Sequence, residues 1–248
     1  MNLSAIIFDV DGTLADTERN GQRPAFNAAF AEDGLAWHWD EELYGSLLAV
    51  AGGKERIRHF AARHDPAFLS RPDCDDRIAR LHAAKTRHFV ARLETGGIHI
   101  PLRPGVAELI DEARAANLLL AIATTASPEN VAALLRANLG PTAESWFAVI
   151  GAGDVVPAKK PAPDIYRWVL QRLDLPAGAC LAVEDSAHGL AASLGCGIPT
   201  LVTSNDYTRQ QDFRGALTVL PDLGGTRLDQ LRRLHRLGRI PGRSAHTP

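Results

Sequence analysis

Short apolar runs, separated by stretches with helical spacing, recur along most of the chain. The intervening stretches repeat apolar residues at three- and four-residue steps and predict helices over Val106–Ala116, Asn130–Ala137, Asp164–Leu173 and Ala187–Leu194. Strands that alternate with helices form βαβ units, so we expect an α/β fold with a doubly wound parallel sheet and helices on both faces. The predicted strands are Ala5–Val10, Leu118–Thr124, Phe147–Ile150, Leu181–Val183, Thr200–Thr203 and, more weakly, Thr218–Leu220.

The chain between the first and second predicted strands is too long for one crossover. Residues 17–97 show helical patterns and no strand pattern. We therefore expect a separate helical bundle inserted after the first strand, and a core formed by residues 1–16 and 98–248. The predicted helices of the insert are Arg23–Asp33, Asp40–Val50, Lys54–His64 and Asp75–Leu93.

Composition narrows the class of protein. The 248 residues carry a formal net charge of −2, which gives no general case for a nucleic-acid or membrane partner. The three cysteines, Cys74, Cys180 and Cys196, form no C-x-x-C pair, as is usual in a reducing compartment. No stretch has the pattern of a secretory signal or a membrane span, so we expect a cytoplasmic protein. We also expect a monomer.

Two aspartates spaced by one residue directly follow the first predicted strand. Asp9 and Asp11 lie on the same side of an extended chain, and Gly12 permits a turn that other residues disfavour. Open α/β sheets bind their ligands at the carboxyl ends of their strands. Two carboxylates this close repel, so the pattern predicts a bound cation or a shared proton. A solvated strand end is the simpler alternative.

Similar polar clusters follow two later strands and open one helix. Because the carboxyl ends of parallel strands meet at one edge of a sheet, we expect these clusters to join the aspartates in one cleft. Ser186 is also a typical N-terminal cap for the helix after it. The clusters are Thr124, Thr125, Ala126 and Ser127; Lys159 and Lys160, before Pro161; and Glu184, Asp185 and Ser186.

Four groups follow one another along the chain: an aspartate pair, a hydroxyl, a lysine and an acidic pair. In this order they resemble the four motifs of the haloacid dehalogenase-like (HAD) superfamily of phosphotransferases. The resemblance extends from about Ser4 to Thr203. It implies a Rossmann-like core and makes residues 17–97 a helical cap that closes over the site. It also implies hydrolysis of phosphoric monoesters, with Asp9 as the nucleophile that forms an aspartyl phosphate and Asp11 as the general acid and base.

The same resemblance implies Mg²⁺ as the cofactor. Its ligands would be Asp9, the backbone carbonyl of Asp11, and Asp185, with Glu184 in or near the ligand set. Hard oxygen ligands suit Mg²⁺, and a carboxylate needs a countercharge to approach a phosphate dianion. Lys160 would supply a second positive charge, next to the phosphoryl oxygens and Asp9.

The core hydroxyl has two candidates. Thr124 and Thr125 are adjacent and point in opposite directions on a strand. We favour Thr125, with the backbone N–H of Ala126 beside it, because the run that ends at Ser127 resembles that of related sugar-phosphate enzymes.

The core lysine also has two candidates. Lys160 immediately precedes a Pro-x-Pro-Asp run, as the family lysine does, and we favour it over Lys159, which is then a solvated charge. The corresponding prolyl bond is often cis in the family, so we expect a cis Lys160–Pro161 bond; an ordinary trans turn is the alternative.

Basic groups in the inserted helices predict a second anion site. Two glycines precede a helix whose first turn carries a lysine and an arginine, so backbone N–H groups and two cations gather at its start. Another lysine interrupts the apolar face of the Asp75–Leu93 helix, where it either extends to solvent or meets an anion. The candidate substrate ligands are Gly52, Gly53, Lys54, Arg56 and Lys85, with Glu18 as a partner for sugar hydroxyls; we expect Tyr44 to serve in packing.

These stretches resemble the CbbY-like branch of the superfamily, near the β-phosphoglucomutases. The matching runs are Ala15–Glu18, Ala25–Asn27, Gly52–Arg56 and Lys85–Thr86. The branch dephosphorylates sugar bisphosphates, xylulose 1,5-bisphosphate above all, an inhibitor of the Calvin-cycle enzyme rubisco. The resemblance thus implies a phosphosugar substrate, with a phosphosugar mutase or a non-catalytic binding module as alternatives. Relatives often carry a histidine after the Asp-Thr-Glu run, whereas this chain reads Arg19-Asn20-Gly21-Gln22.

The segment from Thr226 to the end carries six arginines and one acid, Asp229. Four leucines repeat there at three-residue steps, at positions 228, 231, 234 and 237. We expect a terminal helix docked by these leucines, followed by a frayed basic tail. A membrane or nucleic-acid patch is the alternative.

Overall fold

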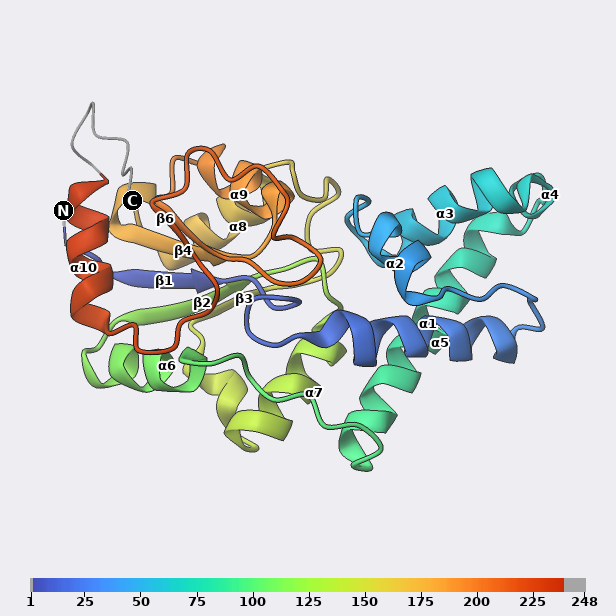
Figure 1. The fold of residues 1–248 in the computed structure, drawn as a ribbon, viewed down its shortest axis with the longest axis horizontal. Coiled ribbons are helices and arrows are strands. Elements are labelled where there is room, and N and C mark those ends of the chain that lie inside the picture. Colours follow the sequence, from blue (N-terminus) through green and yellow to red (C-terminus); the bar gives the residue numbers. More distant parts are fainter. Residues whose placement is uncertain (1, 239–248) are drawn as a thin grey trace.

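A six-stranded parallel sheet forms the centre of the larger part of the molecule (Figure 1). The computed structural model describes residues 2–238. The strand order is β3-β2-β1-β4-β5-β6, so β1 lies in the middle and the order reverses direction beside it. This confirms the predicted α/β fold with a doubly wound parallel sheet. The strands are β1 (Ala5–Phe8), β2 (Leu119–Ala123), β3 (Val149–Gly151), β4 (Cys180–Glu184), β5 (Thr200–Thr203) and β6 (Thr218–Leu220).

Helices cover both faces of the sheet because alternate side chains of β1 point to opposite sides. Ile6 and Phe8 pack in the core that includes residues of α6 (Val106–Ala115), α7 (Pro128–Leu139) and α10 (Leu228–Leu237). The other face, with Ala5 and Ile7, packs against α8 (Asp164–Leu173) and α9 (Ala187–Leu194). Two 3₁₀ turns, Ala143–Trp146 and Ala177–Ala179, complete the connections.

The helices between β1 and β2 form a second unit beside the sheet (Figure 1). They enclose a core of their own, rich in aromatic rings: Phe26 and Phe30 each have a ring centroid 4.8 Å from that of Trp39. The sequence does not predict the short helix α4 (Pro66–Leu69) or the π-helical turn before α1 (Arg23–Glu32). The elements are the π-helix Glu18–Gln22, α1 (Arg23–Glu32), α2 (Glu41–Leu47), α3 (Gly53–His64), α4 (Pro66–Leu69) and α5 (Cys74–Glu94).

Two chain segments connect the helical unit to the sheet, and they lie side by side. Ala15 in the first segment forms an antiparallel bridge with Leu102 in the second. Arg103 follows directly, and its buried guanidinium donates to the backbone carbonyls of Gly12, Thr203, Ser204 and Pro221. The second connection is therefore fixed to the carboxyl ends of β1, β5 and β6.

The terminal helix α10 (Leu228–Leu237) is present, and Leu228 and Leu231 are buried against the sheet unit as expected. Leu237 departs from the pattern, because its side chain is 49% exposed. The basic tail expected after the helix falls on residues 239–248, which lie outside the described residues. Within residues 2–238, no helix combines the length and apolarity needed to cross a membrane.

Candidate active site

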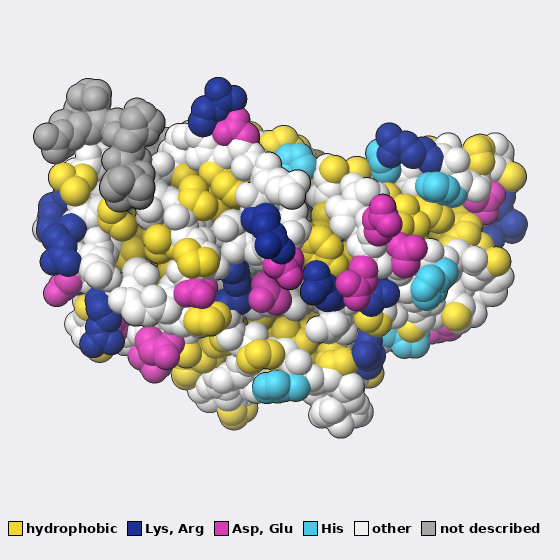
Figure 2. Space-filling model, viewed as in Figure 1, with side chains coloured by type: hydrophobic (Ala, Val, Ile, Leu, Met, Phe, Trp, Pro, Cys, Tyr) yellow, Lys and Arg dark blue, Asp and Glu magenta, His cyan; other side chains and the backbone are white. Residues whose placement is uncertain are grey.

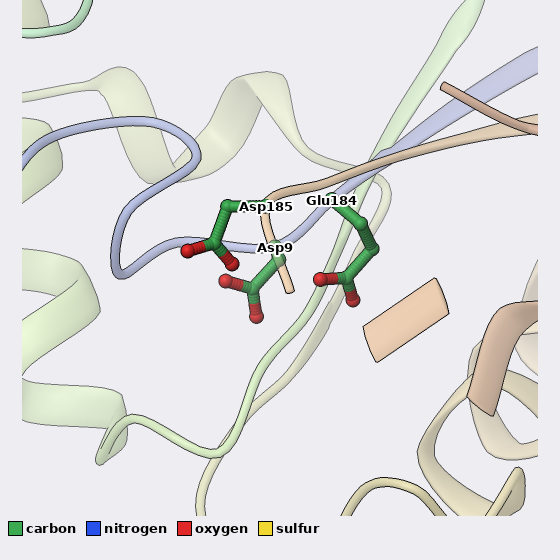
Figure 3. A group of neighbouring side chains, drawn as sticks. All are labelled: Asp9, Glu184 and Asp185. Atoms are coloured by element: carbon green, nitrogen blue, oxygen red, sulfur yellow. The ribbon is translucent and has the colours of Figure 1, made fainter. Parts of the chain in front are cut away.

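Three buried carboxylates meet at the carboxyl edge of the sheet. Asp9 directly follows β1, Glu184 ends β4 and Asp185 follows it, and β1 and β4 are neighbours. One oxygen of each side chain lies within 4.8 Å of one oxygen of the other two. In Figure 3 the Asp9 carboxylate lies between those of Asp185 and Glu184. The parallel sheet thus brings together residues 175 positions apart, as the strand-end pattern predicts.

Burial disfavours the charged form of these carboxyl groups. It raises the pKa of Asp9 to about 7, and the Glu184 charge adds to that rise while Lys160 opposes it. Burial and the charges of Asp9 and Glu184 raise the pKa of Asp185 well above its ordinary range. Without an added positive charge, the cluster therefore holds protons at neutral pH.

Lys160 is the cation of the cluster. Its Nζ atom donates to Asp9 Oδ1 at 2.7 Å, to Glu184 Oε1 at 2.6 Å and to the carbonyl oxygen of Ala123 at 2.8 Å. These carboxylates keep the pKa of Lys160 above its ordinary value, although burial opposes its charge. The choice of Lys160 over Lys159 thus agrees with the structure. The Lys160–Pro161 bond is cis, as expected.

The two threonines after β2 have different surroundings. The Thr124 side chain is buried, and its hydroxyl accepts a hydrogen bond from the backbone N–H of Ala126 at 3.2 Å. The Ala126 N–H, expected to face a phosphoryl oxygen, is therefore already bonded in this structure. Thr125 is half-buried, and it lines the cleft together with Thr124, Ala126 and Ser127. Both predicted hydroxyls thus reach the cleft.

Two glycines let backbone approach the carboxylates. Gly12 has φ = +82°, and a Cβ atom there would lie 2.3 Å from Asp185 Oδ2. A Cβ atom at Gly189, in the first turn of α9, would lie 1.8 Å from Glu184 Oε2. Glycine is required at both positions because the backbone itself forms part of the wall around the acids.

Asn205 and Tyr166 make contacts that the sequence did not predict. The Asn205 side-chain amide donates to Asp185 Oδ2 at 2.7 Å, and the Tyr166 hydroxyl donates to Glu184 Oε1 at 2.5 Å. Asn205 lies two residues past the end of β5, so the same strand-end pattern could have pointed to it. Tyr166 lies within α8, where an aromatic residue ordinarily signals only core packing.

A cleft of about 120 Å³ extends from the acidic cluster toward the helical unit. In Figure 2, basic and acidic side chains gather along the boundary between the sheet and the helical unit. The cleft contains both the strand-end residues and most of the basic candidates of the insert. Its lining includes Asp9, Asp11, Glu18, Gln22, Gly52, Gly53, Arg56, His82, Lys85, Thr125, Lys160, Asp185 and Asn205.

Glu18, Tyr44 and Arg56 form a buried cluster at the end of the cleft provided by the helical unit. The Tyr44 hydroxyl donates to Glu18 and accepts from Arg56 Nη1 at 3.0 Å. Burial raises the pKa of Glu18, with Arg56 opposing the rise. Tyr44 thus does more than pack, because it joins the carboxylate to the guanidinium.

Lys85 lies on the same wall of the cleft and is buried. Its ammonium lies 4.9 Å from the ring centre of Phe26, and no described residue offers it a carboxylate within ion-pair distance. Burial lowers its pKa to about 8. Burial and the nearby Lys85 and Lys54 charges lower the pKa of His82 to about 4, so this histidine adds an uncharged ring to the cleft at neutral pH.

Lys54 is the exception among the basic candidates of the insert. Its Nζ atom bonds Asp154 Oδ2 at 2.7 Å, and its side chain does not line the cleft. The predicted contact of Lys54 with the substrate stays a prediction, and in this structure an acid from the loop after β3 bonds this side chain outside the cleft. Lys159, expected to be solvated, bonds the other oxygen of Asp154 at 2.6 Å.

The acidic cluster fits a hard divalent cation. Three buried carboxylates face one lysine, and Glu184 Oε2 is a buried oxygen with no hydrogen-bond partner among the described residues. Clustered carboxylate oxygens are the ligands that Mg²⁺ prefers. A bound dication would also offset the burial that raises the pKa values of Asp9 and Asp185.

Comparison with known proteins agrees with the geometry. The family model of haloacid dehalogenase-like hydrolases matches residues 3–197, which include all of the strand-end acids described above. The chain belongs to the haloacid dehalogenase-like hydrolase family. The predicted class of enzyme, a hydrolase of phosphoric monoesters, is confirmed, as is the Rossmann-like core.

The predicted CbbY-like branch is confirmed as well. The plasmid-encoded protein CbbY of Cupriavidus necator is 54% identical over 222 residues, which are 90% of this chain and 86% of that protein. The crystal structure of CbbY from Rhodobacter sphaeroides in complex with phosphate has a TM-score of 0.84 and 48% identity, and covers 93% of this chain and 99% of that one. A mutant of the same protein in complex with xylulose 1,5-bisphosphate has a TM-score of 0.84, with 47% identity and the same coverage.

Proposed function

We propose that this enzyme is an Mg²⁺-dependent phosphatase of a sugar bisphosphate, with xylulose 1,5-bisphosphate as the foremost candidate. One observation carries the proposal: a single cleft has Asp9 and Lys160 at one end and two buried cations, Arg56 and Lys85, at the other. Each end offers positive charge to one phosphate. The xylulose 1,5-bisphosphate complex of the similar Rhodobacter protein supports this choice of substrate.

The chemistry takes place at the sheet end of the cleft. Asp9 attacks phosphorus, the bond to the sugar oxygen breaks, and an aspartyl phosphate forms on Asp9. Asp11 gives its proton to the leaving sugar oxygen and later takes a proton from the water that hydrolyses the aspartyl phosphate. Lys160 and Thr125 bind the phosphoryl oxygens, and Lys160 also favours the ionised form of Asp9, which its 2.7 Å contact supports.

Mg²⁺ would be held by side-chain oxygens of Asp9 and Asp185 and by the backbone carbonyl of Asp11, with Glu184 at the edge of this ligand set. Bound there, it neutralises the charge of the nucleophile and the phosphoryl group. Asn205 orients Asp185 through its 2.7 Å bond, and Lys160 and Tyr166 orient Glu184.

The helical unit, residues 17–97, is the cap, and residues 1–16 with 98–248 form the core. Arg56 and Lys85 bind the phosphate that is not cleaved, and Glu18 binds sugar hydroxyls through the carboxylate that Tyr44 orients. The backbone at Gly52 and Gly53 lines the cleft between the two ends. Since Lys54 is bonded to Asp154, we assign it no substrate contact.

The direct test is phosphate release across a panel of ketose and aldose monophosphates and bisphosphates, with Mg²⁺. We expect one phosphate released per bisphosphate, and a higher kcat/KM for a bisphosphate than for its matched monophosphate. Isomerisation of a sugar phosphate with no net phosphate release would show a mutase instead. Tight binding of the bisphosphate with no turnover would show a binding module.

A further inference from the structure

Gln22 contacts the carboxylate that we assign as general acid and base. Its side-chain nitrogen donates to Asp11 Oδ1 at 2.8 Å, and the Thr17 hydroxyl donates to the same oxygen. Neither bond uses Asp11 Oδ2, which has no hydrogen-bond partner among the described residues. The two donors thus fix one oxygen of Asp11 and leave the other for proton transfer.

A third residue fixes the orientation of the Gln22 amide. Asp11 Oδ1 accepts from Gln22, so the Gln22 nitrogen faces Asp11 and its oxygen faces away. That oxygen lies 3.4 Å from the side-chain nitrogen of Asn130, in α7 of the core. Gln22 and Asn130 are both buried. The donors therefore run in one direction, from Asn130 through Gln22 to Asp11.

The backbone around Gln22 has an unusual winding. Residues Glu18–Gln22 form a π-helix, in which the backbone N–H of Arg23 bonds the carbonyl of Glu18, five residues earlier. Single π-helical turns shift the direction of the side chains that follow them and occur often at functional sites. The turn presents the Gln22 side chain to Asp11 while Arg23 continues into α1.

We propose that Gln22 is a positioning residue for Asp11, which holds Oδ2 in place for proton transfer to and from the substrate. This inference rests on the proposed function. No sequence pattern assigned a role to Gln22, which appeared only as part of a run that departs from the relatives. Because Gln22 belongs to the helical unit and Asp11 to the core, their bond joins the two units at the reacting group.

The test is Gln22→Met, which keeps the length of the side chain and removes its N–H groups. We expect kcat for the sugar bisphosphate to fall about 10- to 100-fold, part of the roughly 10²- to 10⁴-fold that a general acid and base supplies, with KM changed by less than about twofold. In an Asp11→Ala background, the same substitution should lower kcat no further. The control is Gln171→Met, an exposed position in α8, which should leave both constants unchanged.

Three results would overturn the inference. They are an unchanged kcat, a rise in KM alone, which would make Gln22 a substrate ligand, and an equal loss of kcat in both backgrounds. If the wild-type enzyme releases no phosphate from any phosphosugar, the proposed function fails. The contact between Gln22 and Asp11 is then tested by denaturant unfolding of the wild type, the two single variants and the double variant. Non-additive changes in stability support the contact with Asp11, and additive changes refute it.

Discussion

Lys54 of the helical unit and Asp154 of the core form an ion pair with 2.7 Å between Nζ and Oδ2. Lys159 bonds the second oxygen of Asp154 at 2.6 Å, and the two lysines together lower the pKa of Asp154 to about 2. The acid is therefore ionised throughout the physiological range. The contact joins the helical unit to the core outside the cleft and gives Lys54 an acidic partner within the protein.

We expect Asp154→Asn to weaken the contact between the two units while leaving the chemistry intact. The pair is largely exposed, so its contribution to stability is small, on the order of 0–1 kcal/mol. KM for the substrate should rise about two- to fivefold with little change in kcat. The measurement is KM against salt concentration: added salt should raise the wild-type KM toward that of the variant. Equal salt dependence in both proteins would contradict this account.

Asp9→Asn should abolish turnover, because an amide is a poor nucleophile. The fold should survive, since asparagine has the same shape and removes a carboxylate whose pKa burial raises to about 7. Phosphate release and a thermal melt on the same preparation check both statements. A variant with near wild-type activity would refute Asp9 as the nucleophile.

Removal of divalent metal with EDTA should abolish activity, and Mg²⁺ should restore it. Asp185→Ala should raise the Mg²⁺ concentration needed for half-maximal activity by roughly ten- to a hundredfold or more, because a ligand oxygen is lost. Asp111→Ala, at an exposed position in α6, is the control and should leave the Mg²⁺ requirement unchanged. Full activity in metal-free enzyme would contradict the cofactor assignment.

Lys85→Ala should lower kcat/KM only for substrates that carry a second phosphate. A lost hydrogen bond to a charged group costs about 1.5–3 kcal/mol, so kcat/KM for a bisphosphate should fall about ten- to a hundredfold. The matched monophosphate should lose little. Arg87→Ala, two residues further along α5 and paired with Glu32 on the surface, is the control. The same loss for both substrates would exclude a role of Lys85 in binding the distal phosphate.

The lowered pKa of Lys85 predicts a pH dependence. A lysine loses its charge as pH rises through its pKa, so kcat/KM for a bisphosphate should fall as pH rises through about 8. The ratio of kcat/KM values for bisphosphate and monophosphate isolates this effect from other titrations. In Lys85→Arg the decline in that ratio should disappear, because arginine stays charged. A decline that persists in the arginine variant would assign it to another group.

The sequence was sufficient where the place of a side chain follows from its position along a strand. Each acid of the cluster directly follows or ends an apolar run, so the sequence alone predicts that Asp9, Glu184 and Asp185 lie at one edge of the sheet. The same holds for Thr125 and Lys160, because their neighbours in the chain match short family motifs.

The sequence was insufficient where a side chain meets a partner from another element. The bond between Lys54 and Asp154 could not be predicted, because the two residues are 100 positions apart and lie side by side only in the fold. Tyr44 appeared as a packing residue because nothing local shows that its hydroxyl lies between Glu18 and Arg56. The role of Gln22 was not predicted because the residues of a π-helical turn lack the regular apolar spacing by which helices are recognised in a sequence.

The bridge between Ala15 and Leu102 joins the two connections between the helical unit and the core. Two separate tethers would allow the helical unit to tilt and slide in several directions, whereas two connections bonded to each other at one residue pair act as a single axis. Arg103 anchors that axis to four carbonyls of the core. We expect any opening of the cleft to turn about this axis and to return Arg56 and Lys85 to the same place relative to Asp9. We expect the placement of this axis to set the span between the two phosphates of the proposed bisphosphate substrate.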